Sequence, residues 1–278
     1  MTRIQVNIDE HPCFGTSGHH ECGRIHLPVA PRCNISCNYC DRRFHCVNQS
    51  RPGVTRRVMT PAEAMDFITK NDTPENALTV AGIAGPGEPL FNQPTFETLR
   101  LLDDHHPRLT KCISTNGLLL LDKVDELAAL NVSTVTVTMN ALSVETSRRI
   151  YRLPPRLIRG ATETEIHRYF LQRQQDGLTA AVEAGMIVKV NTVLLPGINQ
   201  DEINDIACFA EERGAYIMNV MPLIPQGKLK DLPAPTVPQV AFAKIIAGRH
   251  MNLLQNCGQC RADAVGKLAD AAGMCGAA

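Results

Sequence analysis

The sequence predicts an α/β protein whose core is a partial, TIM-like (β/α)6 barrel with extensions at both ends. Short runs rich in β-branched residues alternate with helical patterns along most of the chain. This alternation is typical of parallel strands with helices packed outside them. The six repeats found here are fewer than the eight that close a barrel, so we expect an open sheet.

The expected strands follow one another at 24–29, 78–83, 111–114, 134–139, 186–195 and 216–221. The expected helices lie between them, at 61–70, 93–104, 122–130, 163–184 and 200–213. Thr60, with Glu63 three residues later, forms a helix-start signature. Asn199 with Glu202 predicts a second helix start of the same kind.

The 278 residues divide into an N-terminal extension (1–23), the barrel (24–225) and a C-terminal tail (226–278). We expect both extensions to lie over the barrel mouth. Lys and Arg total 28, as do Asp and Glu, and no basic run stands out, so we expect neither a nucleic-acid nor a membrane partner. The chain has no apolar run of about 18 residues. Its start also lacks the apolar core of a signal peptide, so the expected location is the cytoplasm.

Cys33, Cys37 and Cys40 form a C-x3-C-x2-C motif directly after the first expected strand. Three thiolates on one loop can hold three irons of a [4Fe–4S] cube and leave the fourth iron open for a small chelating molecule. The spacing differs from that of bacterial ferredoxins, which disfavours a simple electron carrier. Zinc is the remaining alternative, although zinc prefers two cysteine pairs that close a four-ligand site. An odd total of 11 cysteines also favours bound metal over disulfides.

The turn at 84–89 follows the second expected strand and reads Ala-Gly-Pro-Gly-Glu-Pro. Gly85 and Gly87 permit a close backbone approach, and Glu88 is suited to receive a cationic amine. Alone, this stretch reads equally well as an ordinary turn that ends a strand. After a cysteine loop one strand earlier, it is better interpreted as a site for an amino-acid group.

Further polar side chains follow the next strands at the same end of the barrel. Ser114 and Asn116 come after the third strand and can bond ribose hydroxyls or a carboxylate. Asn140 follows the fourth strand, and Asn191 lies within the fifth. The alternatives, an Asn-Gly turn and ordinary strand-end residues, stay open for these positions.

Together these motifs resemble the radical S-adenosylmethionine superfamily and, within it, the proteins of nitrogenase cofactor biosynthesis. The resembling segments are 11–14, 24–40, 46–54, 81–90, 114–117 and 257–264. The resemblance implies that Cys33, Cys37 and Cys40 hold the catalytic [4Fe–4S] cluster that cleaves S-adenosylmethionine. The residues expected to bind S-adenosylmethionine are Tyr39, Gly85, Gly87, Glu88, Ser114, Asn116, Asn140, Asn191 and Met221.

The resemblance also implies two further [4Fe–4S] clusters, which are substrates rather than resident cofactors. One would be held by Cys13, His26 and Cys112, which are expected to converge at the barrel mouth, and the other by Cys46, Cys257 and Cys260. From spacing alone, His26 and Cys112 read as core residues. Cys257 and Cys260 read as metal ligands, with a zinc half-site as the alternative.

The implied activity fuses the two clusters into an [8Fe–9S–C] product, with a carbon from S-adenosylmethionine and one added sulfur. The implied partners are an iron–sulfur cluster donor, an electron donor such as a ferredoxin, and a separate carrier for the product. The chain is expected to be a short form without the carrier domain found in many bacterial relatives. The alternatives are a radical enzyme with auxiliary clusters that acts on an organic substrate, and a non-catalytic iron–sulfur scaffold.

Three cysteines have no place in these ligand sets. Cys208 falls on an amphipathic helix and is expected in the protein core, and Cys22 is a candidate substitute ligand. Cys275 lies in the Ala- and Gly-rich end of the tail.

Overall fold

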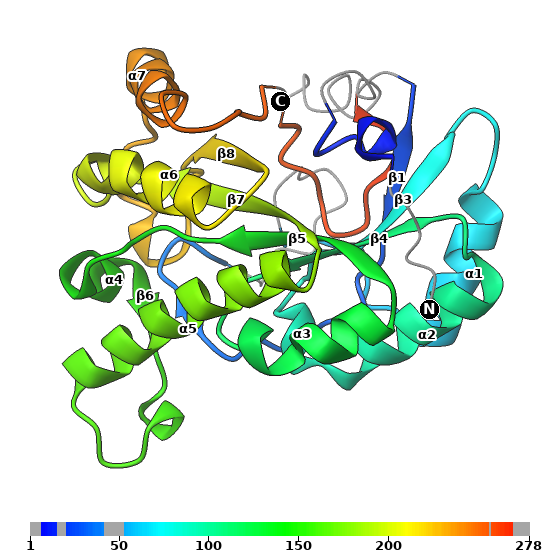
Figure 1. The fold of residues 1–278 in the computed structure, drawn as a ribbon, viewed down its shortest axis with the longest axis horizontal. Helices are drawn as coiled ribbons and strands as arrows, with labels where there is room; N and C mark the ends of the chain where they lie inside the picture. Colours follow the sequence, from blue (N-terminus) through cyan, green and yellow to red (C-terminus); the bar gives the residue numbers. More distant parts are fainter. Residues whose placement is uncertain (1–6, 16–20, 42–52, 256, 269–278) are drawn as a thin grey trace.

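The computed structural model describes residues 7–15, 21–41, 53–255 and 257–268. Its centre is a seven-stranded sheet with the order β8-β7-β5-β4-β3-β1-β9. Six of these strands pair in parallel and in chain order, and together they curl into a half-barrel, shown in Figure 1. They are β1 Gly23–His26, β3 Leu78–Ile83, β4 Thr110–Thr115, β5 Val132–Thr138, β7 Ile187–Leu194 and β8 Ile217–Pro222. The predicted partial barrel is therefore confirmed.

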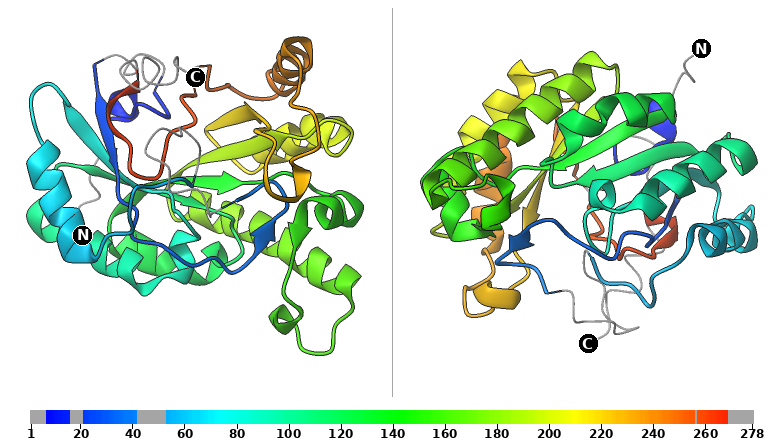
Figure 2. Two further views of the ribbon diagram at one scale, coloured as in Figure 1. Left: turned by 180° about the vertical axis from the view of Figure 1, so that it is seen from behind. Right: turned by 90° about the horizontal axis from the view of Figure 1, so that it is seen from below.

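Helices connect the parallel strands and cover the convex face of the sheet (Figure 2). The connecting helices are α1 Pro61–Asn71, α2 Gln93–His105, α3 Leu120–Ala129, α4 Val144–Ile150, α5 Glu163–Glu183 and α6 Ile203–Glu212. Short 3-10 turns lie at Ile8–Glu10, Pro89–Phe91, Pro155–Leu157, Gln200–Glu202 and Gly227–Leu229. No helix among the described residues is long and apolar enough to cross a membrane.

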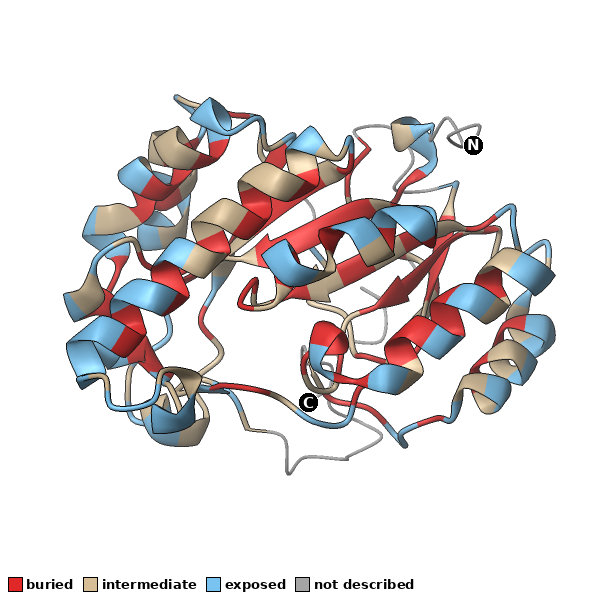
Figure 3. Ribbon diagram, turned by 60° about the horizontal axis from the view of Figure 1, so that its bottom comes forward, coloured by how far each residue is buried: buried red, intermediate tan, exposed pale blue. Residues whose placement is uncertain are grey.

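The apolar core lies between the sheet and these helices (Figure 3). Leu99 of α2, Ile113 of β4, Leu127 of α3 and Val188 of β7 are fully buried in one cluster. The central strands are covered on this face by helices, so their outward side chains are apolar. Their other face lines the concave side of the half-barrel and carries polar groups.

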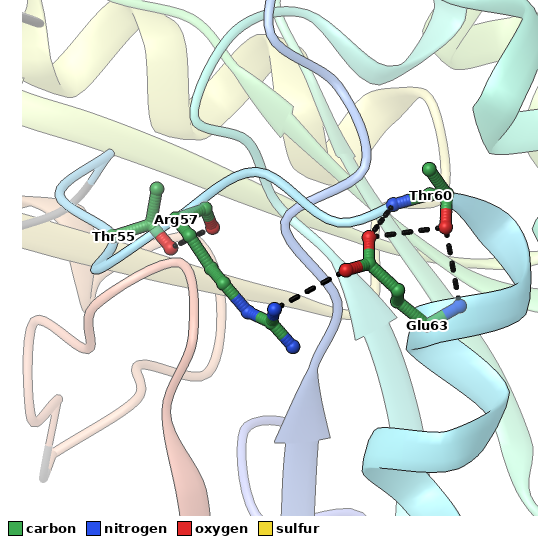
Figure 4. A network of polar contacts seen from close by, with 4 residues as sticks. All are labelled: Thr55, Arg57, Thr60 and Glu63. Atoms are coloured by element: carbon green, nitrogen blue, oxygen red, sulfur yellow. Dashed lines mark hydrogen bonds and ion pairs between the residues drawn. The ribbon is translucent and has the colours of Figure 1, made fainter.

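The start of α1 shows why the sequence predicts that helix well. The Thr60 hydroxyl accepts a hydrogen bond from the Glu63 N–H, and the Glu63 carboxylate accepts one from the Thr60 N–H at 2.8 Å. Arg57 pairs with Glu63 at 3.2 Å (Figure 4). This reciprocal capping satisfies donors that a helix start leaves free.

The second predicted helix start, at Asn199, has the right position but not the predicted side-chain capping: a 3-10 turn begins at Gln200 with Asn199 as its N-cap and leads into α6. The Asn199 side chain makes no cap; it accepts from the Leu195 N–H and donates to the carbonyls of Asn140 and Val193. Glu202 accepts from the Leu142 N–H at 2.6 Å instead. Both side chains thus join the loops after β5 and β7. They do so because the buried N–H and C=O groups of these loops have no water to bond to, whereas a helix start at the surface does.

The described part of the C-terminal tail contains a Pro-rich stretch, at 232–238, but becomes helical within that stretch. It forms α7 Val237–Ala247, which begins with a capping box at Thr236 and Gln239 and packs on α6 and β8. The chain then returns to the concave side, where β9 Val265–Lys267 pairs antiparallel to β1 (Figure 1). This segment therefore occupies the edge of the sheet beside β1.

The N-terminal extension lies at the opposite end of the strands from the expected position. The Glu10 carbonyl accepts from the Thr79 hydroxyl at 2.7 Å, and His11 lies 3.4 Å from the Thr134 hydroxyl. Thr79 and Thr134 belong to the first halves of β3 and β5. The described part of the extension therefore closes the floor of the half-barrel, while the C-terminal tail covers its concave side.

Candidate active site

A cavity of about 370 Å³ occupies the concave side of the half-barrel. Its mouth is formed by the cysteine loop and the turn after β3, and its floor by the N-terminal extension. All eight described cysteine and histidine residues that the sequence assigns as ligands line this one cavity. They are Cys13, His26, Cys33, Cys37, Cys40, Cys112, Cys257 and Cys260. Cys46 and Cys275 lie outside the described residues.

The cysteine loop is held by a short strand pair. Cys37 lies in β2 Ser36–Cys37, which pairs antiparallel with β6 Tyr151–Arg152. Burial, together with the neighbouring thiols of Cys40 and Cys33, raises the pKa of the Cys37 thiol far above its usual range. A [4Fe–4S] cube binds each cysteine through a different iron, so three thiols spaced along one loop can occupy three corners of the cube. This donor set fits a [4Fe–4S] cluster.

A strap from the segment after β8 braces the loop from the other side. The Asn38 carbonyl accepts from the N–H groups of Lys228 and Leu229, at 2.8 and 3.1 Å. Gly227 has a φ of +60°, and a Cβ at this position would stand 2.8 Å from the Cys40 carbonyl oxygen. Only glycine fits this contact without displacing the loop.

Glu88 organises the turn after β3 from within. Its side chain is 3% exposed, and its carboxylate accepts from the Thr115 hydroxyl at 2.5 Å, the Asn116 N–H at 2.7 Å and the Leu90 N–H at 3.1 Å. Burial nevertheless raises the pKa of Glu88 to about 7. The carboxylate thus joins the ends of β3 and β4, and its contact with an amine remains a prediction.

The remaining residues expected to bind S-adenosylmethionine divide into two groups. Those that line the cavity are Tyr39, Gly87, Glu88, Ser114, Asn116, Asn191 and Met221, whereas Gly85 and Asn140 do not. Asn140 is fully buried; its amide donates to the Tyr39 hydroxyl at 2.9 Å and its oxygen accepts from the Val193 N–H. Asn140 therefore positions Tyr39 rather than facing the cavity.

His26 and Cys112 flank a glycine, Gly82, which places no side chain between them. In the register of the sheet, His26 of β1 stands opposite Gly82 of β3, which stands opposite Cys112 of β4. A Cβ at Gly82 would lie 3.1 Å from the His26 ring. Because neighbouring strands are about 4.8 Å apart, the two ligands face each other across a space that only glycine leaves open.

The hydrogen bonds of the two floor histidines assign them different roles. His26 Nδ1 lies 2.9 Å from the Arg261 carbonyl, so it carries the proton and leaves Nε2 free to bind iron. Burial lowers the pKa of His26 to about 4, which keeps the ring neutral. In His11, Nδ1 accepts from the Cys13 N–H at 3.1 Å and Nε2 faces the Thr134 hydroxyl. His11 therefore shapes the Cys13 turn and has no free nitrogen for a ligand.

Cys13, His26 and Cys112 line the cavity near its floor, not at its mouth as expected. Cys112 is the third residue of β4, and the Cys13 carbonyl accepts from the Lys189 ammonium at the start of β7. Burial raises the pKa of the Cys13 thiol to about 12. The position follows from the N-terminal extension, which enters the half-barrel from the end where the strands begin.

The remaining cysteines stand elsewhere or belong to the tail. Cys260 Sγ accepts from Arg24 at 3.0 Å, which joins the tail to β1. Cys22 does not line the cavity and lies near Thr79 and Glu10, so it is not placed as a substitute ligand. Cys208 is half-buried beside Glu212 rather than in the core. Among the described residues, no three His, Cys, Asp or Glu side chains are close enough to hold a single metal ion.

Sequence reasoning missed three residues of this site: Arg24, Lys189 and Asn219. All three are buried, line the cavity and lie on strands. The available signal was a polar residue at every second position of an otherwise apolar strand, as in Arg24 with His26 and Lys189 with Asn191. In a parallel strand buried on both faces, that pattern marks the face that meets a ligand.

A half-barrel with a three-cysteine loop after its first strand and a glycine-rich turn after its second defines a radical S-adenosylmethionine protein. The Radical SAM superfamily matches residues 27–210 of the chain. Two solved structures share the fold at low sequence identity. Streptococcus suis SuiB bound to S-adenosylmethionine has a TM-score of 0.59 at 14% identity, over 83% of this chain and 49% of that one. A radical SAM methyltransferase from Sphaerobacter thermophilus has a TM-score of 0.57 at 18% identity, over 84% and 64%.

Curated relatives at higher identity are FeMo cofactor biosynthesis proteins NifB. The protein from Methanocaldococcus infernus is 42% identical over 96% of this chain and 89% of its own length. The protein from Azotobacter vinelandii is 37% identical over 96% of this chain but only 54% of its own length. The chain thus belongs to the radical SAM superfamily and, within it, to the NifB family. It spans about half the length of the Azotobacter relative.

Proposed function

We propose that this chain is a radical S-adenosylmethionine enzyme of FeMo cofactor biosynthesis. It joins two [4Fe–4S] units, bound as substrates, into an [8Fe–9S–C] precursor with a carbon from S-adenosylmethionine and one added sulfur. The observation that carries the proposal is the cavity itself. The cysteine loop, the Cys13–His26–Cys112 set and the Cys257–Cys260 pair, which come from distant parts of the chain, all line it.

Different residues that line this cavity have different roles in the proposed reaction. Cys33, Cys37 and Cys40 would hold the catalytic cluster, which supplies the electron for cleavage of S-adenosylmethionine when bound. Glu88 fixes the turn beside it, and the strap at Gly227–Leu229 keeps the cysteine loop in place. The neutral His26, with its free Nε2, offers a more labile ligand than a thiolate, which suits a unit that must leave as product.

Partners follow from this chemistry as part of the proposal. The enzyme needs a donor of [4Fe–4S] units, a low-potential electron donor such as a ferredoxin, and a carrier for the product.

The test separates cleavage of S-adenosylmethionine from binding of the substrate units. Each single change of Cys33, Cys37 or Cys40 to Ala should abolish 5′-deoxyadenosine formation under anaerobic, reducing conditions, because each thiolate holds one iron of the catalytic cluster. Cys208→Ala is the matched control, since Cys208 lies on α6 outside the cavity, and it should retain wild-type yield. Normal yield from any of the three loop variants would refute the assignment.

The substrate site is tested by counting iron. A Cys13→Ala, Cys112→Ala double variant should keep the catalytic cluster and fall from ~12 to ~8 iron atoms, which is three cubes becoming two. It should still cleave S-adenosylmethionine, but form no eight-iron product. An unchanged iron count would show that Cys13, His26 and Cys112, which we call the floor set, hold no cluster. That result would favour an enzyme that acts on an organic substrate.

A further inference from the structure

Two buried cations on the cavity wall have no acidic partner. Arg24 of β1 is 1% exposed and Lys189 of β7 is 6% exposed. Among the described residues, neither takes part in an ion pair with Asp or Glu. Taking an unpaired charge out of water is strongly unfavourable. A ligand of opposite charge would remove that cost.

Lys189 reaches the floor set. Its ammonium donates to the Cys13 carbonyl at 3.2 Å and lies 4.7 Å from the centre of the Phe14 ring. The same ammonium acts electrostatically on the thiols of Cys13 and Cys112, where it opposes the rise in their pKa that burial causes. The cation therefore stands beside both thiols of the first ligand set.

Arg24 stands between the floor set and the Cys257–Cys260 pair, which we call the tail set. One guanidinium nitrogen donates to Cys260 Sγ at 3.0 Å and another donates to the Gly266 carbonyl. The third nitrogen, Nε, has no partner within the described part of the chain. On its other side, Arg24 is close enough to His26 to help lower the pKa of that ring. One side chain thus touches the tail set and borders the floor set.

A second buried lysine shows that the fold can supply a partner where one is needed. Lys111 of β4 is 1% exposed, but its ammonium pairs with Asp103 and donates to the Leu130 carbonyl at 2.7 Å. Lys111 and Lys189 are thus both buried lysines of one sheet, on strands β4 and β7, which β5 separates. They differ in their surroundings: the Lys111 ammonium pairs with a carboxylate, whereas the Lys189 ammonium faces a cavity lined by thiols.

We propose that Arg24 and Lys189 form a cationic pair that holds the anionic iron–sulfur substrates between the two ligand sets. The proposal rests on the proposed function and names the residues that position its substrates. The thiolates of the two sets outnumber the positive charges of two oxidised [4Fe–4S] cores, and each added electron makes the assembly more anionic. A fixed cation at the floor and one between the sets offset that charge, and they act more strongly because both side chains are buried.

The experiment compares Lys189→Met, Lys189→Arg and Lys111→Met with the unsubstituted chain. Each protein is made cluster-free, its unfolding by urea is measured, and it is then loaded anaerobically with iron and sulfide without S-adenosylmethionine. Lys189→Met should unfold at equal or higher urea, because an unpaired buried charge is gone. It should load the substrate clusters about tenfold more weakly, a loss of ~1.4 kcal/mol. The clusters that do load should have a lower reduction potential, since a nearby positive charge is lost.

Lys189→Arg should restore most of the loading because it keeps the charge, and an Arg24→Gln variant should weaken loading as Lys189→Met does. Lys111→Met should show the opposite pattern, with lower stability and unchanged loading.

A purely structural role for Lys189 predicts lower stability and no rescue by Arg, and that result would overturn the proposal. Equal loading by Lys189→Met and the unsubstituted chain, at ~12 iron atoms each, would overturn it while leaving the proposed function intact. If the unsubstituted chain itself loads only ~4 iron atoms, the proposed function fails and this proposal fails with it.

Discussion

At the scale of single residues, Glu88 is a carboxyl group that the fold buries and then surrounds with three donors. The donors come from Thr115, Asn116 and Leu90, and they favour the ionised form. Burial acts in the opposite sense and is the larger effect, so the pKa of Glu88 is about 7 rather than 4.5. The folded protein therefore binds a proton between these two pH values that the unfolded chain has released.

This raised pKa predicts a pH dependence of stability with a definite sign. The contribution of Glu88 is complete below pH 4.5 and is lost as the pH rises through about 7. The stability of the unsubstituted chain relative to Glu88→Gln should therefore fall between pH 5 and pH 8, by on the order of 1–3 kcal/mol. Urea unfolding of both cluster-free proteins at several pH values measures it. A relative stability that rises with pH would mean that the three hydrogen bonds outweigh burial.

Gly82 offers a second test at this scale. A Cβ there would stand 3.1 Å from the His26 ring, so Gly82→Ala should displace the ring and weaken the floor set. The variant should fold well, because alanine and larger residues suit a strand better than glycine does. Its iron content should fall from ~12 toward ~8 atoms. In a chain that already carries His26→Ala, Gly82→Ala should have no further effect on iron, and an added loss there would contradict this explanation.

Prediction from sequence worked for residues whose neighbours in the chain carry the signal. The cysteine spacing and the Gly-Pro-Gly-Glu-Pro turn are local patterns, and both lie at the cavity. Arg24 and Lys189 gave only a weak local signal, their alternation with His26 and Asn191, because a lysine or arginine inside a strand is ordinarily read as a surface residue. Their role depends on which strands curl together and on a tail that returns from more than 200 residues away along the chain, as the Arg24–Cys260 contact shows.

At the scale of elements, the strap at Gly227–Leu229 predicts a loss of function without a loss of fold. Gly227→Ala would place a Cβ 2.8 Å from the Cys40 and Asn38 carbonyl oxygens, which must then move with the cysteine loop. We expect a several-fold drop in 5′-deoxyadenosine yield and faster loss of the catalytic cluster in air.

Gly160→Ala is the matched control for the strap. Gly160 also has a positive φ, +79°, but a Cβ there meets nothing within 4 Å. Both changes carry the same backbone cost of about 1–2 kcal/mol, and only Gly227→Ala touches the loop. If the two variants lose activity equally, backbone strain and not the strap contact is the cause.

Element prediction succeeded where capping and periodicity coincide and failed where tertiary pairing decides. Helix α1 was found because Thr60 and Glu63 cap it within four residues of sequence. Strand β9 is three residues long and exists only because β1 offers an edge. Helix α7 begins within the Pro-rich stretch at 232–238, which predicts no helix, although Pro238 lies in the first turn of the helix, where proline is accepted.

At the scale of the whole molecule, the chain closes its cavity from both ends of the sequence. The N-terminal extension fills the floor with Phe14, which packs with Ile217 and Leu254. The described part of the tail crosses the concave side and reaches β1, so β1 and β9, from opposite ends of the sequence, pair at the same edge of the half-barrel (Figure 2). Arg24 and Lys189 are buried within this cavity, and such surroundings strengthen their electrostatic effects.

The tail is held by two kinds of contact, and this difference gives a prediction for the whole molecule. Its last described part is fixed by protein alone: Ala262 N–H donates to the Val54 carbonyl, and the Ala264 carbonyl accepts from the His26 N–H, both at 2.8 Å. The turn from Cys257 to Cys260 lies at the cavity, and the Gln259 amide reaches the Pro222 carbonyl at 3.2 Å. Cluster binding would add ligands only to this turn.

Hydrogen exchange of the cluster-free and loaded proteins should therefore separate the two segments. Amides of β9 and Ala262 should be protected in both forms, because their partners are backbone groups of the barrel. Amides at 257–260 should become at least tenfold better protected on loading, since metal binding and local folding are coupled. A Cys257→Ala, Cys260→Ala variant should lose that gain and keep the protection of β9. If loading protects β9 and the turn to the same degree, the whole tail docks only with the cluster, and the β1–β9 pairing does not hold it by itself.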